Sequence, residues 1–188
     1  MNAVLPCRVI TVVTFSGDHS HAFVRRFLRA LNDEKSGRGP GPARLDCLLV
    51  TGHTGVSTNG SKIVHAFNPD VANLPAWQFM DRLKRGESLP GVVRDDTAVF
   101  VAAVQHGLLV QSFNVLVPDA RFREFQAVLA AEQRQRRFTY GFPDGNGDCN
   151  CTTWLERIGL PLLTGRMWEF GKLPGIAAYP SRRFGECT

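Results

Sequence analysis

The chain has 188 residues, of which 44% are hydrophobic and 21% are charged, and its net charge is +5. These values fit a globular domain with its own apolar core and exclude wholesale disorder, a collagen-like repeat and a small scaffold that depends on disulfides. No apolar run reaches the roughly 18 residues of a membrane span, and we therefore predict one domain over residues 1–188 without such a span.

The N-terminal part is predicted to contain a strand, a helix and a flexible loop, in that order. Residues 9–15 (VITVVTF) predict a strand that ends at a turn over residues 16–18. Apolar residues at helical spacing between Ala22 and Leu31 predict a helix. The glycine- and proline-rich sequence of residues 36–42 predicts a flexible loop.

A hairpin is the strongest local signal in the next segment. Residues 45–50 predict a strand, and Asn59-Gly60 is typical of a two-residue hairpin turn, with residues 62–67 as the returning strand. Residues 68–90 predict an insertion that carries one short helix, with Trp77 and Leu83 facing inward.

The second half alternates strands and helices. Residues 98–104 and 108–117 predict two strands, and Pro118-Asp119 opens a helix. A glycine-rich turn over residues 141–147 leads to Cys149-Asn150-Cys151, where a helix over residues 152–158 is expected. We therefore predict an α+β fold, an antiparallel sheet bracketed by helices.

Cys151 is the first candidate functional residue. A thiol at a helix N-terminus ionises more readily, because unpaired N–H groups and the helix dipole stabilise the thiolate. The same N–H groups can stabilise an oxyanion. A cysteine in this position is also commonly a small buried apolar residue, so the position alone does not establish catalysis.

Two histidines flank the predicted hairpin. His53 and His65 each lie about six positions from its turn, which should bring their imidazoles close on neighbouring strands. One imidazole can then serve as base for Cys151 while the other orients it. Asn68 and His106 are alternative orienting residues, whereas Asp95 and Asp96 are expected to face solvent.

Two motifs together resemble a known superfamily. The segment GHTGVSTNGSKIVHA, residues 52–66, is similar to the histidine strand and hairpin of NlpC-type cell-wall peptidases, which are papain-like. The segment NCTTWL, residues 150–155, resembles the cysteine helix of their circularly permuted relatives, which include lecithin retinol acyltransferase. The histidine precedes the cysteine here, as it does in the permuted branch.

The resemblance implies a papain-like thiol hydrolase that cleaves an amide, isopeptide or ester bond through an acyl-enzyme. It implies Cys151 as nucleophile, His53 as base and His65 as orienting residue, with no cofactor and no metal. A lipid or protein acyltransferase of the same fold is the near alternative. Residues 1–42 and the insertion at 68–90 have no counterpart in the resemblance, so the substrate stays open.

The alternative from a different class is a non-catalytic binding or structural module, in which this constellation is degenerate or holds a metal. Cys149 and Cys151 with His19 and His21 offer four zinc ligands on paper. The alternating Asp and Asn residues from Asp144 onward imitate half of a calcium loop, but Cys149 stands where that loop needs glycine.

Charge and cysteine content bear on partners and compartment. The arginine clusters at residues 25–29, 134–137 and 182–183 are typical of solvated surfaces. No basic motif interleaved with aromatic residues accompanies them, so nucleic acid is not an expected partner. Five cysteines, an odd count, leave at least one free thiol. Without a recognisable signal peptide, we expect a cytoplasmic protein or an effector exported by a signal-peptide-independent route.

Overall fold

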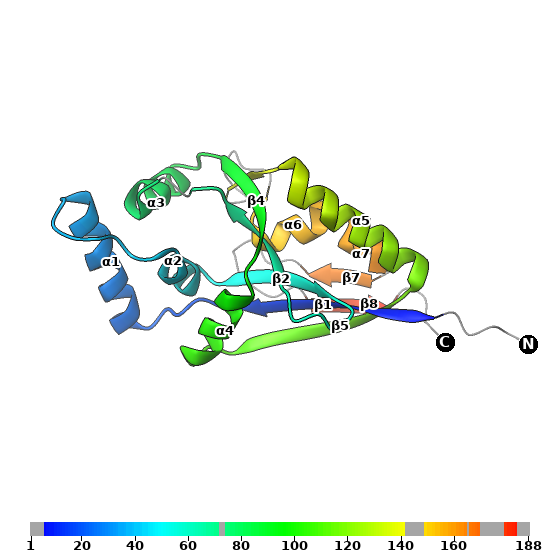
Figure 1. Ribbon diagram of the computed structural model, residues 1–188. Helices are drawn as coiled ribbons and strands as arrows, with labels where there is room; N and C mark the ends of the chain where they lie inside the picture. Colours follow the sequence, from blue (N-terminus) through cyan, green and yellow to red (C-terminus); the bar gives the residue numbers. More distant parts are fainter. Residues whose placement is uncertain (1–5, 72–73, 142–148, 165, 170–178, 184–188) are drawn as a thin grey trace, which may run out of the picture.

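The protein is an α+β fold with an open, six-stranded antiparallel sheet, seen here in a computed structural model (Figure 1). The structure describes residues 6–71, 74–141, 149–164, 166–169 and 179–183. Among these residues, no helix is long and apolar enough to cross a membrane. The Gly-rich turn predicted at residues 141–147 lies almost wholly outside the described residues.

The sheet has the strand order β5-β1-β2-β3-β4-β6, and a separate ribbon pairs β7 with β8. Its longest pair is β1 with the edge strand β5, which runs in register from Cys7 opposite Pro118 to Phe15 opposite Val110. The strands are β1 (Cys7–Phe15), β2 (His53–Thr58), β3 (His65–Pro69), β4 (Leu89–Asp95), β5 (Val110–Pro118), β6 (Thr139–Tyr140), β7 (Arg166–Glu169) and β8 (Tyr179–Arg183).

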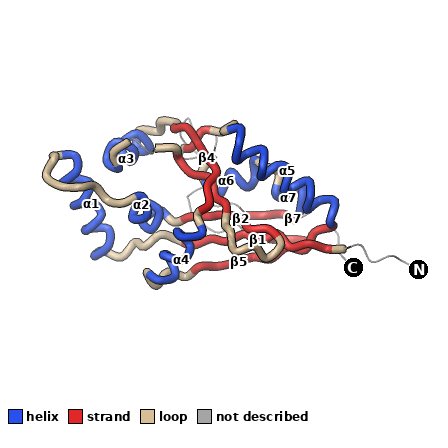
Figure 2. Tube along the Cα trace, viewed as in Figure 1, coloured by secondary structure: helices blue, strands red, loops and turns tan. Residues whose placement is uncertain are grey.

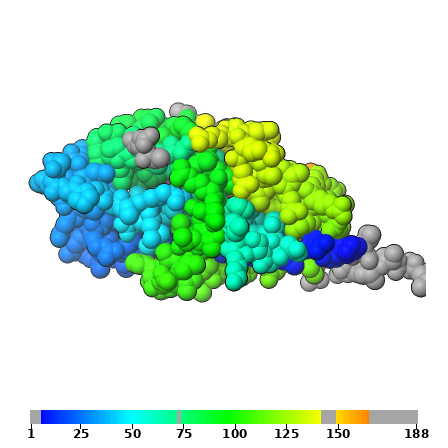
Figure 3. All heavy atoms as spheres, viewed as in Figure 1, coloured from blue at the N-terminus to red at the C-terminus, as the bar shows by residue number. Residues whose placement is uncertain are grey.

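Helices lie on one face of the sheet and around one end of its strands (Figures 1 and 2). They are α1 (His21–Lys35), α2 (Arg44–Thr51), α3 (Ala76–Lys84), α4 (Thr97–Gln105), α5 (Asp119–Gln135), α6 (Cys151–Arg157) and α7 (Leu160–Thr164). In the space-filling view, β4 crosses the visible face with α3 above it and α4 below it (Figure 3).

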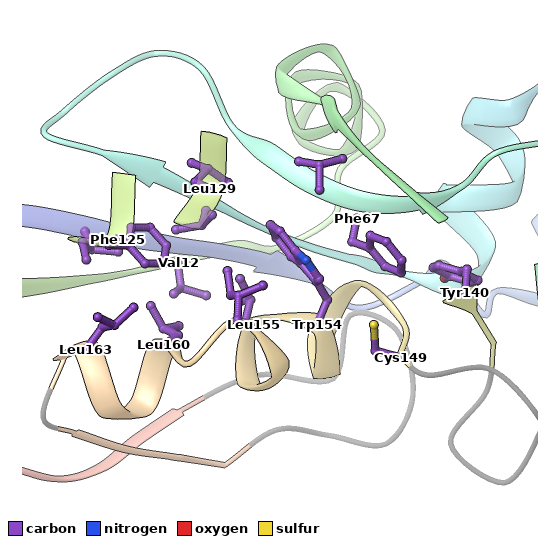
Figure 4. Close-up of a cluster of buried hydrophobic side chains, with 14 of the residues drawn as sticks. Val12, Phe67, Phe125, Leu129, Tyr140, Cys149, Trp154, Leu155, Leu160 and Leu163 are labelled. Atoms are coloured by element: carbon purple, nitrogen blue, oxygen red, sulfur yellow. The ribbon is translucent and has the colours of Figure 1, made fainter. Parts of the chain in front are cut away.

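The larger core lies between the sheet and helices α5, α6 and α7. Trp154 of α6 is fully buried and stacks on Phe67 of β3, with ring centroids 5.9 Å apart. Figure 4 shows Leu155, Leu160 and Leu163 reaching toward the sheet from below. Burial of these large apolar side chains is the main force that fixes α6, and therefore Cys151, against the strands.

A second core lies at the other side of the strand ends, where α1, α2 and α4 meet β1. It consists of Phe15, Phe23, Leu48, Leu49, Val64, Val99, Phe100 and Ala103. The two cores pack around the start of β2, where Gly52 connects the end of α2 to His53. Gly52 has φ of 79°, a left-handed conformation that glycine adopts without steric cost.

Two predicted strands are helices. Residues 45–50 belong to α2, and residues 98–104 belong to α4. Short apolar runs do not distinguish a buried strand from a buried helix, and local capping decides both cases. The Asp46 carboxylate accepts the N–H of Ala43 at the start of α2, and the Asp95 carboxylate accepts the N–H of Thr97 at the start of α4.

The predicted turn at Asn59-Gly60 is confirmed, but the predicted two-residue hairpin and its register are wrong, because β2 ends at Thr58 and β3 begins only at His65. Asn59 and Gly60 both have positive φ, as a type I′ turn requires. Strands β2 and β3 are antiparallel neighbours, and Val56 pairs with His65. Continuing this register sets His53 level with Asn68, and the alternation of side chains puts His53 and His65 on opposite faces.

Phe125 offers a test of the larger core away from Cys151. Its side chain is fully buried on α5, so Phe125→Ala should lower the free energy of unfolding by about 3–5 kcal/mol. Leu116→Ala, at a side chain that is 55% exposed on β5, should change it by about 0.5 kcal/mol or less. Urea unfolding followed by circular dichroism measures both, and equal losses would contradict this core assignment.

Candidate functional site

Cys151 is the first residue of α6, and its local sequence builds the helix start. The Asn150 side chain accepts the N–H groups of Thr152 and Thr153, each at 2.9 Å, and the Thr153 hydroxyl accepts the N–H of Asn150 at 2.9 Å. This reciprocal capping box fixes where the helix begins. Cys151 is thereby held at the positive end of α6, and its side chain is fully buried.

His53 is the first residue of β2 and lies in an apolar sandwich. Its ring stacks on Phe100 at 5.6 Å and meets the edge of Phe15 at 6.4 Å. His53 Nε2 lies 2.8 Å from an Asp96 carboxylate oxygen, while Nδ1 has no hydrogen-bond partner among the described residues. Because a carboxylate only accepts, Nε2 carries a proton and Nδ1 of the neutral ring carries a lone pair.

The Cys151 thiol and the His53 imidazole change each other's pKa. Burial disfavours the imidazolium, but the charge of Cys151 and the hydrogen bond to Asp96 outweigh it and raise the pKa of His53 to about 9. Burial also disfavours the thiolate, yet the positive charge of His53, together with the Thr54 backbone N–H and the Thr152 hydroxyl, lowers the pKa of Cys151. The pair therefore favours thiolate and imidazolium over two neutral groups.

Asp96 is held ionised by a small polar network. It is 1% exposed and receives hydrogen bonds from Arg44 at 2.8 Å and from the Asn68 amide at 2.5 Å. Burial opposes its negative charge, but the hydrogen bonds and charges of His53 and Arg44 bring its pKa well below the usual range. Arg44 also donates to Asn68 at 2.7 Å, so the network is closed on itself.

A buried chain of hydroxyl groups joins the thiol to the sheet. Thr152 Oγ1 lies 3.9 Å from Cys151 Sγ and 3.0 Å from Thr54 Oγ1, which lies 2.9 Å from Thr14 Oγ1. Thr14 donates its proton to the His53 carbonyl at 3.2 Å. A hydroxyl has one proton, so Thr54 donates to Thr14 and Thr152 donates to Thr54 while the sulfur is a thiol. When the sulfur is a thiolate, Thr152 can instead turn its proton toward it.

His65 does not take the orienting position that the sequence suggested. Its Nδ1 contacts the Gln133 amide at 3.1 Å, and burial lowers the pKa of His65. The partner of His53 is Asp96, because the register turns His65 to the other face of the sheet. The alternative His106 ends α4 and bonds Asp18 at 2.8 Å, whereas the alternative Asn68 lies beside Asp96.

Asp96 is the residue of the candidate site that sequence reasoning missed. It was expected to face solvent together with Asp95, since paired acidic residues usually do. The available signal was Asp96-Thr97 before an apolar stretch, which is typical of a helix start and therefore of an ordered position. Reading residues 98–104 as a strand concealed this signal.

The metal-binding alternatives find no ligand set among the described residues. No group of three or more histidine, cysteine, aspartate or glutamate side chains there converges as a metal site would require. Residues 144, 146 and 148 of the calcium-like sequence lie outside the described residues.

Comparisons with known proteins leave the family of the chain open. No protein-family model matches the sequence, and no curated protein or solved structure gives a significant match. What the chain does must therefore be argued from the Cys151 site itself.

Proposed function

We propose that the protein is a thiol hydrolase that cleaves an amide, isopeptide or ester bond through an acyl-enzyme on Cys151. The observation that carries the proposal is the buried series Cys151, His53, Asp96, in which an activated thiol, a base and an ionised carboxylate follow one another. A purely structural cysteine needs neither a histidine of raised pKa nor a carboxylate behind it.

Each residue of the series has a separate task. The Cys151 thiolate attacks the carbonyl carbon, and the carbonyl oxygen becomes an oxyanion. His53, as imidazolium, then gives its Nδ1 proton to the leaving amine or alcohol. In the second half, His53 Nδ1 takes a proton from water, whose oxygen attacks the thioester and releases the acid. Asp96 holds the Nε2–H throughout and so keeps Nδ1 as the reacting nitrogen.

The oxyanion needs a donor that is not already used. Asn150 occupies the N–H groups of Thr152 and Thr153 but not that of Cys151. The Cys151 N–H at the positive end of α6 is therefore the donor that we assign to the oxyanion.

The order of the elements supports a papain-like, permuted NlpC-type fold as part of this proposal. The histidine strand β2 precedes the cysteine helix α6 in the chain, and α6 packs on β2 and β3. Asp96, which follows β4, takes the place of the orienting residue that the resemblance assigned to His65.

Substitutions at the site test the assignment directly. Cys151→Ala should abolish turnover, and His53→Ala should reduce kcat/KM by about 10²–10⁴-fold, because the base and acid are lost. Asp96→Asn should fall between His53→Ala and the wild type. The measurement is kcat/KM on an ester or amide found by library screening.

Matched controls exist for all three positions. Cys149→Ser, His65→Ala and Asp95→Asn change the same residue types nearby and should retain most of the activity. Equal losses at Cys149 and Cys151 would point to a metal or disulfide pair, and a large loss at His65 would restore it as the orienting residue.

The pH dependence of alkylation tests the ion pair. With the pKa of Cys151 lowered, its reaction with iodoacetamide should persist at pH values at which free cysteine, with a pKa of about 8.5, has become unreactive. Turnover should fall above about pH 9, where His53 loses the proton that the leaving group needs. Asp96→Asn removes the negative charge that stabilises the imidazolium form of His53, and it should therefore move the alkylation profile to higher pH. An unchanged profile in Asp96→Asn would contradict its role.

The hydroxyl chain makes a separate prediction. Thr152→Val removes the donor to the thiolate, and alkylation of Cys151 at pH 6 should slow by about tenfold, the cost of one hydrogen bond to a charged group. Thr152→Ser keeps the hydroxyl and should restore the rate. If the valine and serine variants were alkylated at similar rates and were equally stable in urea, the hydroxyl groups would have a structural role only.

A further inference from the structure

A cavity of about 330 Å³ lies beside the Cys151 site, between α2, α3 and the ends of β3 and β4. At about 30 Å³ for each water-sized volume, it holds a group of roughly ten non-hydrogen atoms. Its walls are mainly apolar. The apolar lining includes Leu48, Val71, Leu74, Phe79, Leu83 and Tyr140.

Two lining residues connect this cavity to the proposed catalytic series. Asn68 lines the cavity and donates to Asp96. Tyr140 lines the cavity and forms an isolated β-bridge with Cys149, two residues before Cys151. Figure 4 places Tyr140 beside Phe67, near Cys149. The cavity is therefore connected to the series through Asn68, which contacts Asp96, and through Tyr140, which pairs with Cys149.

Each charged residue of the cavity wall already has a hydrogen-bond or ion-pair partner in the protein. Arg44 is paired with Asp96, and Arg94 is paired with Asp70 at 2.7 Å. Glu34 accepts the N–H groups of Ala76 and Trp77 at the start of α3. A charged ligand group would lose its hydration on entering this mainly apolar cavity, whereas an apolar group would gain by burial.

We propose that this cavity binds an uncharged, apolar group of the substrate, next to the bond that Cys151 attacks. The proposal rests on the thiol hydrolase function and names the chemistry of its substrate. Because Cys151 is fully buried, a substrate that binds here must displace part of the cavity wall to reach the sulfur.

Alkylation by matched electrophiles tests the proposal. We compare 2-chloroacetamide with its N-(3-phenylpropyl) derivative and with an N-(4-carboxybutyl) derivative, by the rate of Cys151 modification in intact-protein mass spectra. The phenylpropyl reagent should react at least about tenfold faster than the small one, because its side group is buried in the cavity. The carboxylate reagent should show no such gain. Equal gains for both derivatives would overturn the proposal.

Position 74 controls the size of the cavity. Leu74→Trp fills it and should abolish the gain of the phenylpropyl reagent, measured as the ratio of its rate to the rate of 2-chloroacetamide in the same protein. Leu74→Ala enlarges it and should shift the preference to a naphthylpropyl reagent, which keeps the test valid if the tryptophan variant does not fold. Leu109→Trp, at a side chain that is 77% exposed, is the matched control. A phenylpropyl gain that is the same in all four proteins would overturn the proposal.

Binding without reaction separates this proposal from the proposed function. N-(3-phenylpropyl)acetamide, titrated into Cys151→Ala protein by calorimetry, should bind, and Leu74→Trp in the same background should abolish binding. Slow alkylation of Cys151 by 2-chloroacetamide together with Leu74-dependent binding would refute the thiol hydrolase but retain the apolar site. Fast alkylation without such binding would refute the apolar site alone.

Discussion

The hydrogen bond between Asp96 and His53 is the interaction on which the rest of the site depends. It fixes the proton on Nε2 and so leaves Nδ1 as the nitrogen that the proposed mechanism uses. A buried carboxylate is costly unless it is paired, and Arg44 and Asn68 supply the remaining hydrogen bonds. Residues from α2, β2 and β3 therefore all contact the carboxylate of Asp96 at the start of α4.

The two cores explain how this charge cluster is kept in place. Trp154 and Leu155 press α6 onto the sheet from one side, and Phe15 and Phe100 enclose the His53 ring from the other. The low polarity of these walls strengthens each hydrogen bond inside them and raises the cost of breaking one. The same packing of the two cores thus supports both the stability of the fold and the proposed chemistry.

The hydroxyl chain and the apolar cavity extend the site in two directions. Thr152, Thr54 and Thr14 lead from the sulfur into the sheet, with a donor order that depends on whether Cys151 is charged. The apolar cavity borders the site where Asn68 and Tyr140 form part of its wall. The first concerns the state of the nucleophile, and the second concerns what the proposed enzyme accepts.

Local sequence determined the features that depend on neighbouring residues: strand β1, helices α1 and α5, the Asn59-Gly60 turn, and Cys151 at the start of α6 with Asn150 as its cap. It could not determine the identity of α2 and α4, since short apolar runs suit either helix or strand. Nor could it determine the orienting residue, because strand register turns His65 away and brings Asp96, 43 positions along the chain, to His53. Such long-range contacts arise only when the sheet and both cores assemble, and their geometry is not encoded in any one segment.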